Sequence, residues 1–314
     1  MSLYYQPSNK MPLGGAGLFL LGGAAAAAVL ALVYIYAIWY IPFIYINVIL
    51  CGGFGLLLGV VLARLARAGK LRSPLGVGAL AALVALVAVY LEWGVYLTML
   101  FNQPEAPAAV AEPGVAAKIV SSAGLSVGST SFNPSLFARI VADPAGMWSA
   151  MRQINETGTW SLKSSTPTGL LLWAIWLVEA AIIVGGAYLV AAAQAHEPFS
   201  EATDTWADEE TLPHPVGYIA QTADARQAFE TGQFHLLTPH VAESELDQFA
   251  RVKLHCAPND EACQFLTLEN VTAERDKKGK VTQKTTTVVQ RLAISRAAYQ
   301  ALKTQFGAPP AAAQ

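Results

Sequence analysis

Four long apolar stretches dominate the pattern of hydrophobic and polar positions along the chain. Residues 11–63 contain no charged side chain, a length sufficient for two membrane helices of about 20 residues each. Aromatic residues and a proline interrupt this stretch near 39–42, and Asn47 follows, so the pattern predicts helices over 17–40 and 44–64. Two later apolar runs predict transmembrane helices over 76–101 and 168–194.

The first apolar stretch also has one feature of a secretory signal, because residues 24–28 are all alanine. Its uncharged run extends well past the roughly 7–15 apolar residues of a signal peptide, and only Lys10 precedes it as a basic residue. A retained helix is therefore the favoured interpretation, with the cleaved signal as the alternative.

Basic residues between the second and third predicted helices indicate the orientation of the chain. Arg64, Arg67, Lys70 and Arg72 occur there without an acidic residue, and loops of this kind stay in the cytoplasm. Four spans then place both termini in the cytoplasm. The expected location is a bacterial-type inner membrane, crossed several times.

Residues 102–167 are expected to form an extracytoplasmic segment. Its first part, 102–133, is rich in proline, alanine, glycine and serine and predicts a loop. Two short helices are predicted over 134–140 and 145–156, and the second would gather three apolar side chains on one face. Such a face favours a cap on the bundle or a position on the membrane surface, with a partner-binding surface as the alternative. Those side chains are Met147, Met151 and Ile154.

The remainder of the chain is polar and changes its charge part-way. Residues 195–247 hold 11 acidic residues and one basic residue, whereas residues 248–314 hold 5 acidic and 10 basic residues. The acidic residues 195–216 are interrupted by prolines and predict a linker. The charges of the two halves favour mutual attraction within one folded unit.

Residues 217–306 predict a small cytoplasmic α+β domain with an antiparallel sheet. Alternating polar and apolar residues predict strands near 251–255 and 264–268, and threonine- and valine-rich runs predict a hairpin whose turn contains Gly279. Thr222 and Ser295 are candidate N-caps of two short helices. The alanine- and proline-rich residues 307–314 are expected to be a disordered tail.

Composition agrees with this division. The 314 residues are 54% apolar and 13% charged, against about 25% charged in an average soluble domain, which excludes an ordinary soluble enzyme. The fold class predicted is an integral membrane α-helical protein with four transmembrane helices, joined to a small cytoplasmic α+β domain.

Two acidic residues lie within predicted spans, Glu92 in the third and Glu179 in the fourth. Both are about 14–17 Å from the outer ends of their helices at about 1.5 Å per residue, so they share a depth and can meet. An ionised pair at that depth costs several kcal/mol, which favours a protonated pair or a bound cation. Two interpretations stay open: a proton, cation or partner-subunit site, and an interhelical hydrogen bond that fixes packing.

Small residues on the second predicted helix indicate close helix packing. Gly52, Gly55 and Gly59 lie on one side of it, and glycines four residues apart let a neighbouring helix backbone approach. Internal packing is the favoured interpretation of this pattern.

Metal ligation in the C-terminal domain has weak support in the sequence. His255, Cys256 and Cys263 are the candidates, but structural zinc sites bring their cysteines in pairs separated by about two to four residues, and here the cysteines are seven apart. We therefore expect reduced thiols, no metal and no cofactor.

The chain contains no phosphate-binding glycine loop, nucleophile elbow or zinc-protease motif, so we expect a protein that is not an enzyme. Basic residues near 275–284 predict a solvated hairpin tip, with binding to anionic lipid as the alternative, and we expect no binding of nucleic acid.

The first function hypothesis is a scaffold, sensor or accessory subunit whose cytoplasmic domain docks a protein partner. The alternative is an oligomeric proton- or cation-coupled channel or transporter subunit that uses Glu92 and Glu179. Both expect a lipid bilayer and further copies or other membrane subunits around the spans.

Overall fold

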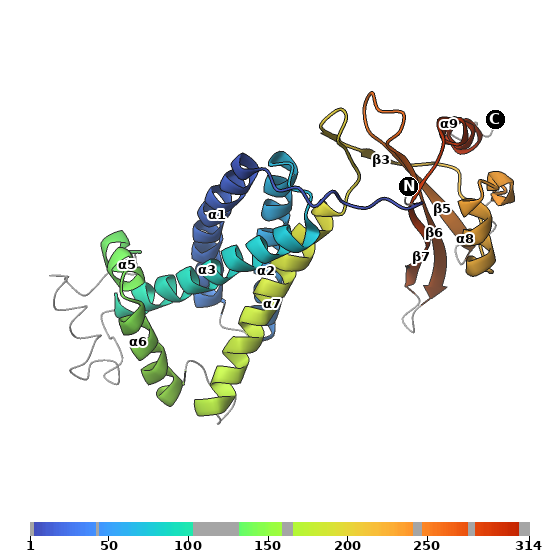
Figure 1. The fold of residues 1–314 in the computed structure, drawn as a ribbon. Coiled ribbons are helices and arrows are strands. Elements are labelled where there is room, and N and C mark those ends of the chain that lie inside the picture. The colour runs from blue at the N-terminus through green and yellow to red at the C-terminus, as the bar shows by residue number, and fades with distance from the viewer. Residues whose placement is uncertain are drawn as a thin grey trace, which may run out of the picture. The chain divides into compact units, whose positions relative to one another are not determined.

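The computed structural model describes residues 3–41, 44–102, 132–158, 166–240, 247–275 and 280–307. The chain forms two compact units (Figure 1). Asn9–Ala195 forms a helical unit, which we call the bundle, and Met1–Ser8 together with His196–Gln314 forms an α+β unit, which we call the C-terminal domain.

Four long helices make up the bundle, and each is long and apolar enough to cross a membrane. α1 and α7 each pack against both α2 and α3, so α1 and α7 occupy opposite corners of the arrangement. The alanines and leucines of their facing sides form one buried core. The helices are α1 (Leu13–Tyr40), α2 (Ile44–Ala68), α3 (Pro74–Phe101) and α7 (Gly169–Ala195).

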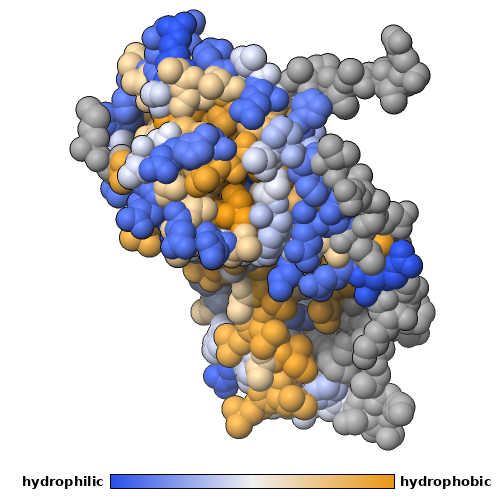
Figure 2. Space-filling model, turned by 90° about the vertical axis from the view of Figure 1, so that its right-hand side faces the viewer, coloured by the Kyte–Doolittle hydropathy of each residue, from blue (hydrophilic) through white to orange (hydrophobic). Residues whose placement is uncertain are grey.

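The outer surface of the bundle is apolar, as expected of a surface that faces lipid. Leu13 and Leu170 are 91% and 89% exposed, and further leucines and valines point outward along every long helix. Figure 2 shows the contrast between this apolar surface and the mostly hydrophilic surface of the C-terminal domain. In water so large an apolar area would be strongly unfavourable, so a bilayer is implied.

Two short helices cap α3, as the sequence pattern favoured. α5 (Pro134–Val141) begins at the cap Asn133, and α6 (Pro144–Thr157) begins at Asp143, whose carboxylate accepts from the Gly146 N–H at 2.9 Å. The apolar sides of α5 and α6 share a core with the C-terminal end of α3. This core includes Met147, Ile154, Leu97 and Phe101.

An antiparallel sheet forms the centre of the C-terminal domain, in agreement with the predicted class. Its order is β3-β5-β6-β7, with β4 pairing with β5 beyond the end of β3. β1 and β2 form a separate two-stranded ribbon. The strands are β1 (Phe199–Ser200), β2 (Thr205–Trp206), β3 (Asp208–Thr211), β4 (Val216–Gly217), β5 (Gln248–Cys256), β6 (Gln264–Arg275) and β7 (Val281–Ala293).

The prediction of a linker over 195–216 is wrong, because strands β1–β3 and the start of β4 fall within it. Asp208 pairs with Cys256 and Thr211 with Lys253, so β3 belongs to the main sheet. All four residues of β3 are exposed. An exposed edge strand buries no alternating apolar face, and its acidic residues therefore resemble a linker in sequence.

Two helices supply the core on the apolar face of the sheet. α8 (Thr222–Glu230) contributes Phe229, and α9 (Arg296–Phe306) contributes Tyr299 and Phe306 to a core that includes the buried valines and leucines of β5, β6 and β7. Ser295 caps α9 as predicted, whereas Thr222 is the first residue of α8 and Gln221 precedes it as the N-cap. A short 3-10 helix, η2 (Phe234–Leu236), follows α8.

The N-terminal residues pair with the C-terminal domain, which the sequence pattern did not predict. The Leu3 carbonyl accepts from the Ala293 N–H at 2.8 Å, and the Tyr5 N–H donates to the Arg291 carbonyl at 2.9 Å. Tyr4 lies between them, opposite Leu292 of β7. The N-terminal residues and the residues after α7 therefore belong to one folded unit, which agrees with an even number of spans.

Several predicted features lie outside the described residues. They are most of the loop 102–133, the hairpin turn with Gly279, part of the basic tip and nearly all of the tail 307–314.

Candidate functional site

Glu92 lies on the side of α3 that faces the interior of the bundle. Its side chain is 9% exposed, and Ala85 and Ala88 on the preceding turns are fully buried. These small residues let neighbouring helices approach α3 closely, so the carboxyl group has little access to the surface.

Glu179 lies half-buried on α7, which packs directly against α3. The two carboxyl groups lie within electrostatic range of each other. Trp93, next to Glu92, meets Trp176 of α7 edge-to-face with 4.7 Å between ring centroids. The structure thus brings together the two acidic residues that their common depth suggested.

Cys51 and Tyr34 complete a polar cluster around this pair. The Cys51 thiol donates to the Glu179 backbone carbonyl at 3.4 Å, and Tyr34 lies within electrostatic range of both carboxyl groups. Cys51 and Tyr34 are 1% and 6% exposed. The sequence indicates neither residue as part of a polar site, since a lone cysteine and a tyrosine in apolar helices are usually packing residues.

One oxygen of this cluster is unusual. Glu92 Oε2 is buried and has no hydrogen-bond partner among the described residues. The four long helices contain lysine or arginine only at the C-terminal end of α2, so none lies at the depth of Glu92. An unpaired, ionised carboxylate is strongly disfavoured there, which leaves a protonated carboxyl or a carboxylate with a bound cation.

The glycines of α2 differ in their surroundings. A Cβ atom on Gly55 would lie 2.8 Å from the Ile183 Cα, and one on Gly59 would lie 2.8 Å from the Val190 Cβ, so both mark the closest approach of α2 to α7. Gly52 has open space at the same position, so it does not share this contact.

The three metal candidates of the C-terminal domain do not converge on one point. Cys256 borders the core under α8 and α9, while Cys263 packs against Ala207 and Ala257 in a separate cluster. His255 lies on the opposite face of β5 from Cys256. Both cysteines are free thiols.

His255 is 2% exposed and is held by one hydrogen bond, between its Nε2 and the Thr267 hydroxyl at 3.0 Å. Burial, the largest cause, lowers the pKa of His255 to about 4, and the nearby Glu209 carboxylate opposes this shift only in part. The imidazole is therefore neutral near pH 7.

A pocket of about 400 Å³ opens between α8, η2 and β4. Tyr218 and Leu236 line it and are 43% and 51% exposed, an unusual exposure for large apolar side chains of this domain. Phe229 contributes to the same lining, and Asp224 is its acidic residue. The pocket therefore combines an apolar lining with one negative charge.

No protein-family model matches the chain, and no curated protein or solved structure is significantly similar to it.

Proposed function

We propose that the chain is a non-catalytic, membrane-anchored subunit whose C-terminal domain docks a protein partner at the cytoplasmic face of a bacterial-type inner membrane. The observation that carries this proposal is the pocket lined by Tyr218 and Leu236. Exposed apolar side chains around a concave site are characteristic of protein-binding surfaces.

The charge around the pocket favours a particular type of partner segment. Asp224 lines the pocket, and the stretch of sequence that contains it, residues 195–247, carries 11 acids and one base. That base, Arg226, donates to the Val288 carbonyl through Nε and Nη2, so it is engaged within the domain. The expected ligand is a segment with a large apolar side chain next to lysine or arginine.

Site-specific photo-crosslinking in the full-length protein in its native membrane tests this proposal. A crosslinker at Leu236 is expected to capture one defined protein, and the matched position Thr285, exposed on β7, is expected not to capture it. Purified partner should then bind the full chain at least tenfold more weakly after Asp224→Lys. Equal capture of the partner at both positions, or an affinity that is unchanged by Asp224→Lys, contradicts the proposal.

A second candidate function is supported by the unpartnered Glu92 oxygen. An oligomer of this chain would conduct protons or small cations past Glu92 and Glu179, because a buried acid without a partner can exchange a proton or ligate an ion. Liposome flux separates the two functions. Conduction requires flux in the wild type that falls at least tenfold in Glu92→Gln, and wild-type liposomes without flux rule it out.

A further inference from the structure

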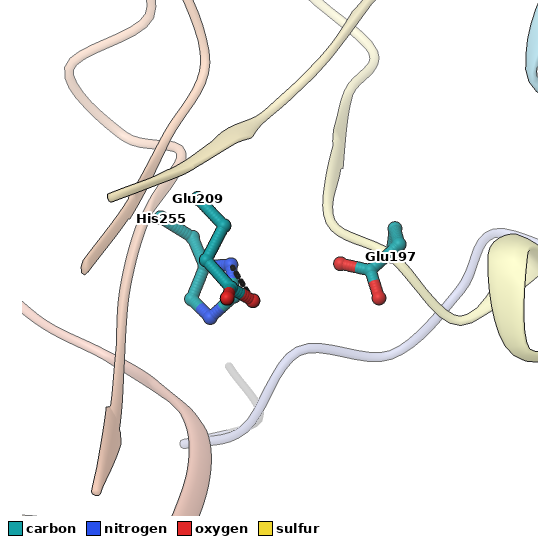
Figure 3. Close-up of side chains that lie close together, drawn as sticks. All are labelled: Glu197, Glu209 and His255. Carbon is teal, nitrogen blue, oxygen red and sulfur yellow. Dashed lines mark ion pairs between the residues drawn. The ribbon is translucent and has the colours of Figure 1, made fainter. Parts of the chain in front are cut away.

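Three side chains on the polar face of the C-terminal sheet converge on one point (Figure 3). His255 comes from β5, Glu209 from the neighbouring strand β3, and Glu197 from the segment that follows α7. One ligand atom of each lies within 4.8 Å of the others. The group contains a nitrogen and two carboxylate oxygens, which are ordinary ligands of first-row divalent metals.

The buried nitrogen of His255 points into this cluster without a hydrogen-bond partner. Its Nδ1 is inaccessible to solvent and unpaired among the described residues, and it lies 3.9 Å from Glu209 Oε2. The other ring nitrogen, Nε2, is engaged by Thr267. When the proton of the neutral ring is on Nε2, the lone pair of Nδ1 points at the carboxylates. Metal-bound histidines typically bind the ion through one ring nitrogen and make a hydrogen bond with the other.

Neighbouring cations orient the two carboxylates without occupying all of their oxygens. Arg291 binds Glu197 Oε1 at 2.6 Å, and Lys253 lies 3.4 Å from Glu209 Oε1. One oxygen of each carboxylate remains outside these ion pairs. Lys253 is shared with Glu269 at 3.2 Å, so three carboxylates face two cations here, and the excess negative charge favours a bound cation.

The backbone of β7 is shaped to bring Arg291 to this cluster. Arg291 has φ of 54° at an irregularity in the pairing of β6 with β7. Its N–H donates to the Thr267 hydroxyl at 3.1 Å, the same hydroxyl that holds His255. A bulge that redirects a side chain toward a cluster of potential ligands is typical of functional positions.

We propose that Glu197, Glu209 and His255 form a binding site for one divalent first-row transition metal ion. Zn²⁺ is the appropriate probe, because it accepts imidazole nitrogen and carboxylate oxygen in tetrahedral geometry and the three ligands leave one position for water or a partner residue. Tetrahedral ligands at about 2.0–2.1 Å from the ion lie about 3.3 Å apart, so the distances between the three ligand atoms need to shorten by up to about 1.5 Å. The ion would fasten the residues that follow α7 to strands β3 and β5.

Metal titration of the full-length protein in detergent tests the site. After treatment with EDTA, the wild type is expected to bind one Zn²⁺ per chain, and Glu209→Gln and His255→Gln each lower the affinity at least tenfold. Glu210→Gln is the matched control. It removes the next acid of β3, which pairs with Lys303 at 2.6 Å, and leaves the affinity unchanged.

Two further measurements distinguish this site from other binding. Co²⁺ in place of Zn²⁺ is expected to lack the intense near-ultraviolet absorption of thiolate ligation, and Cys256→Ser with Cys263→Ser leaves the affinity unchanged. His255 is buried, so His255→Gln can disturb the fold. Glu209 is partly exposed, and Glu209→Gln is expected to retain the fold and to test the site by itself. Absence of saturable binding in the wild type, thiolate absorption, or an affinity equal in Glu209→Gln and wild type overturns the proposal.

Discussion

Single polar side chains replace missing backbone pairing in the C-terminal domain. Asn270 accepts from the Ile219 N–H at 3.1 Å and donates to the Ile219 carbonyl at 2.8 Å, so one amide satisfies both groups of a residue outside the sheet. Arg226 satisfies the Val288 carbonyl where the pairing of β6 and β7 is irregular. Buried backbone groups need such partners, which explains why Asn270 is 3% exposed.

Tyr4 ties the N-terminal residues to α8, and its removal has a defined pH signature. Burial, with the hydrogen bond to Glu230 at 2.5 Å, raises the pKa of Tyr4 to about 12. Because this value is above the unfolded pKa of about 10, the contribution to stability is complete below pH 10 and is lost as the pH rises toward 12. Tyr4→Phe should cost about 0.5–1.5 kcal/mol at pH 8, and the difference from wild type should shrink above pH 10.

Chemical denaturation of the full chain between pH 8 and pH 11 measures this effect. Tyr218→Phe, which changes an exposed hydroxyl, serves as the control and should leave stability unchanged. If the loss of folding stability caused by Tyr4→Phe stays constant up to pH 11, the contribution of the Tyr4 hydroxyl does not depend on its raised pKa, which contradicts the prediction.

The sequence indicates a candidate residue when the environment of that residue is already evident from the surrounding sequence. Glu92 and Glu179 are conspicuous because long apolar runs surround them. Glu209 and Glu197 are inconspicuous among many acids, and only the register of β3 against β5 brings Glu209 opposite His255. Such a register depends on the pairing of distant segments, which no local pattern contains.

At the scale of elements, the contact between α2 and α7 depends on glycines, which have no side chain to keep the two helices apart. The backbone of Ile183 lies where a Gly55 side chain would be, and Ala187 lies close to Gly59. Without strong hydrophobic attraction between helices in lipid, close van der Waals contact of this kind stabilises the pair.

Gly55→Leu is therefore expected to destabilise the bundle by about 1–3 kcal/mol or more, because the helices must separate to admit the side chain. Gly52→Leu is the matched control on the same helix, where open space receives the new side chain. Thermal unfolding in a mild detergent provides the measurement. Equal melting temperatures for the two variants would show that the close contact between α2 and α7 does not depend on Gly55.

Helices and strands with long hydrophobic or alternating sequence patterns are the ones that the sequence predicts best. The four spans follow from long apolar runs, and β5, β6 and β7 follow from alternation or from threonine- and valine-rich composition. β3 and the strand-like residues 3–5 are short and lie at sheet edges, so their pairing depends on the already folded sheet.

At the scale of the whole molecule, one folded domain holds both ends of a chain that has four candidate spans. An even number of spans and the pairing of Leu3 and Tyr5 with β7 are independent observations that agree on this arrangement. By the positive-inside rule, the basic residues between α2 and α3 support our proposal that this side is cytoplasmic. The proposed docking pocket and metal site would then both face the cytoplasm.

Cysteine accessibility in intact cells tests this topology most directly. In a background without native cysteines, single cysteines at Ser8, Lys70 and Thr285 should resist a membrane-impermeant maleimide until the cells are lysed. A cysteine at Tyr40, the last residue of α1, should react in intact cells. Labelling of Ser8 and Thr285 from opposite sides of the membrane would contradict the four-span arrangement, and labelling of both from outside would reverse its orientation.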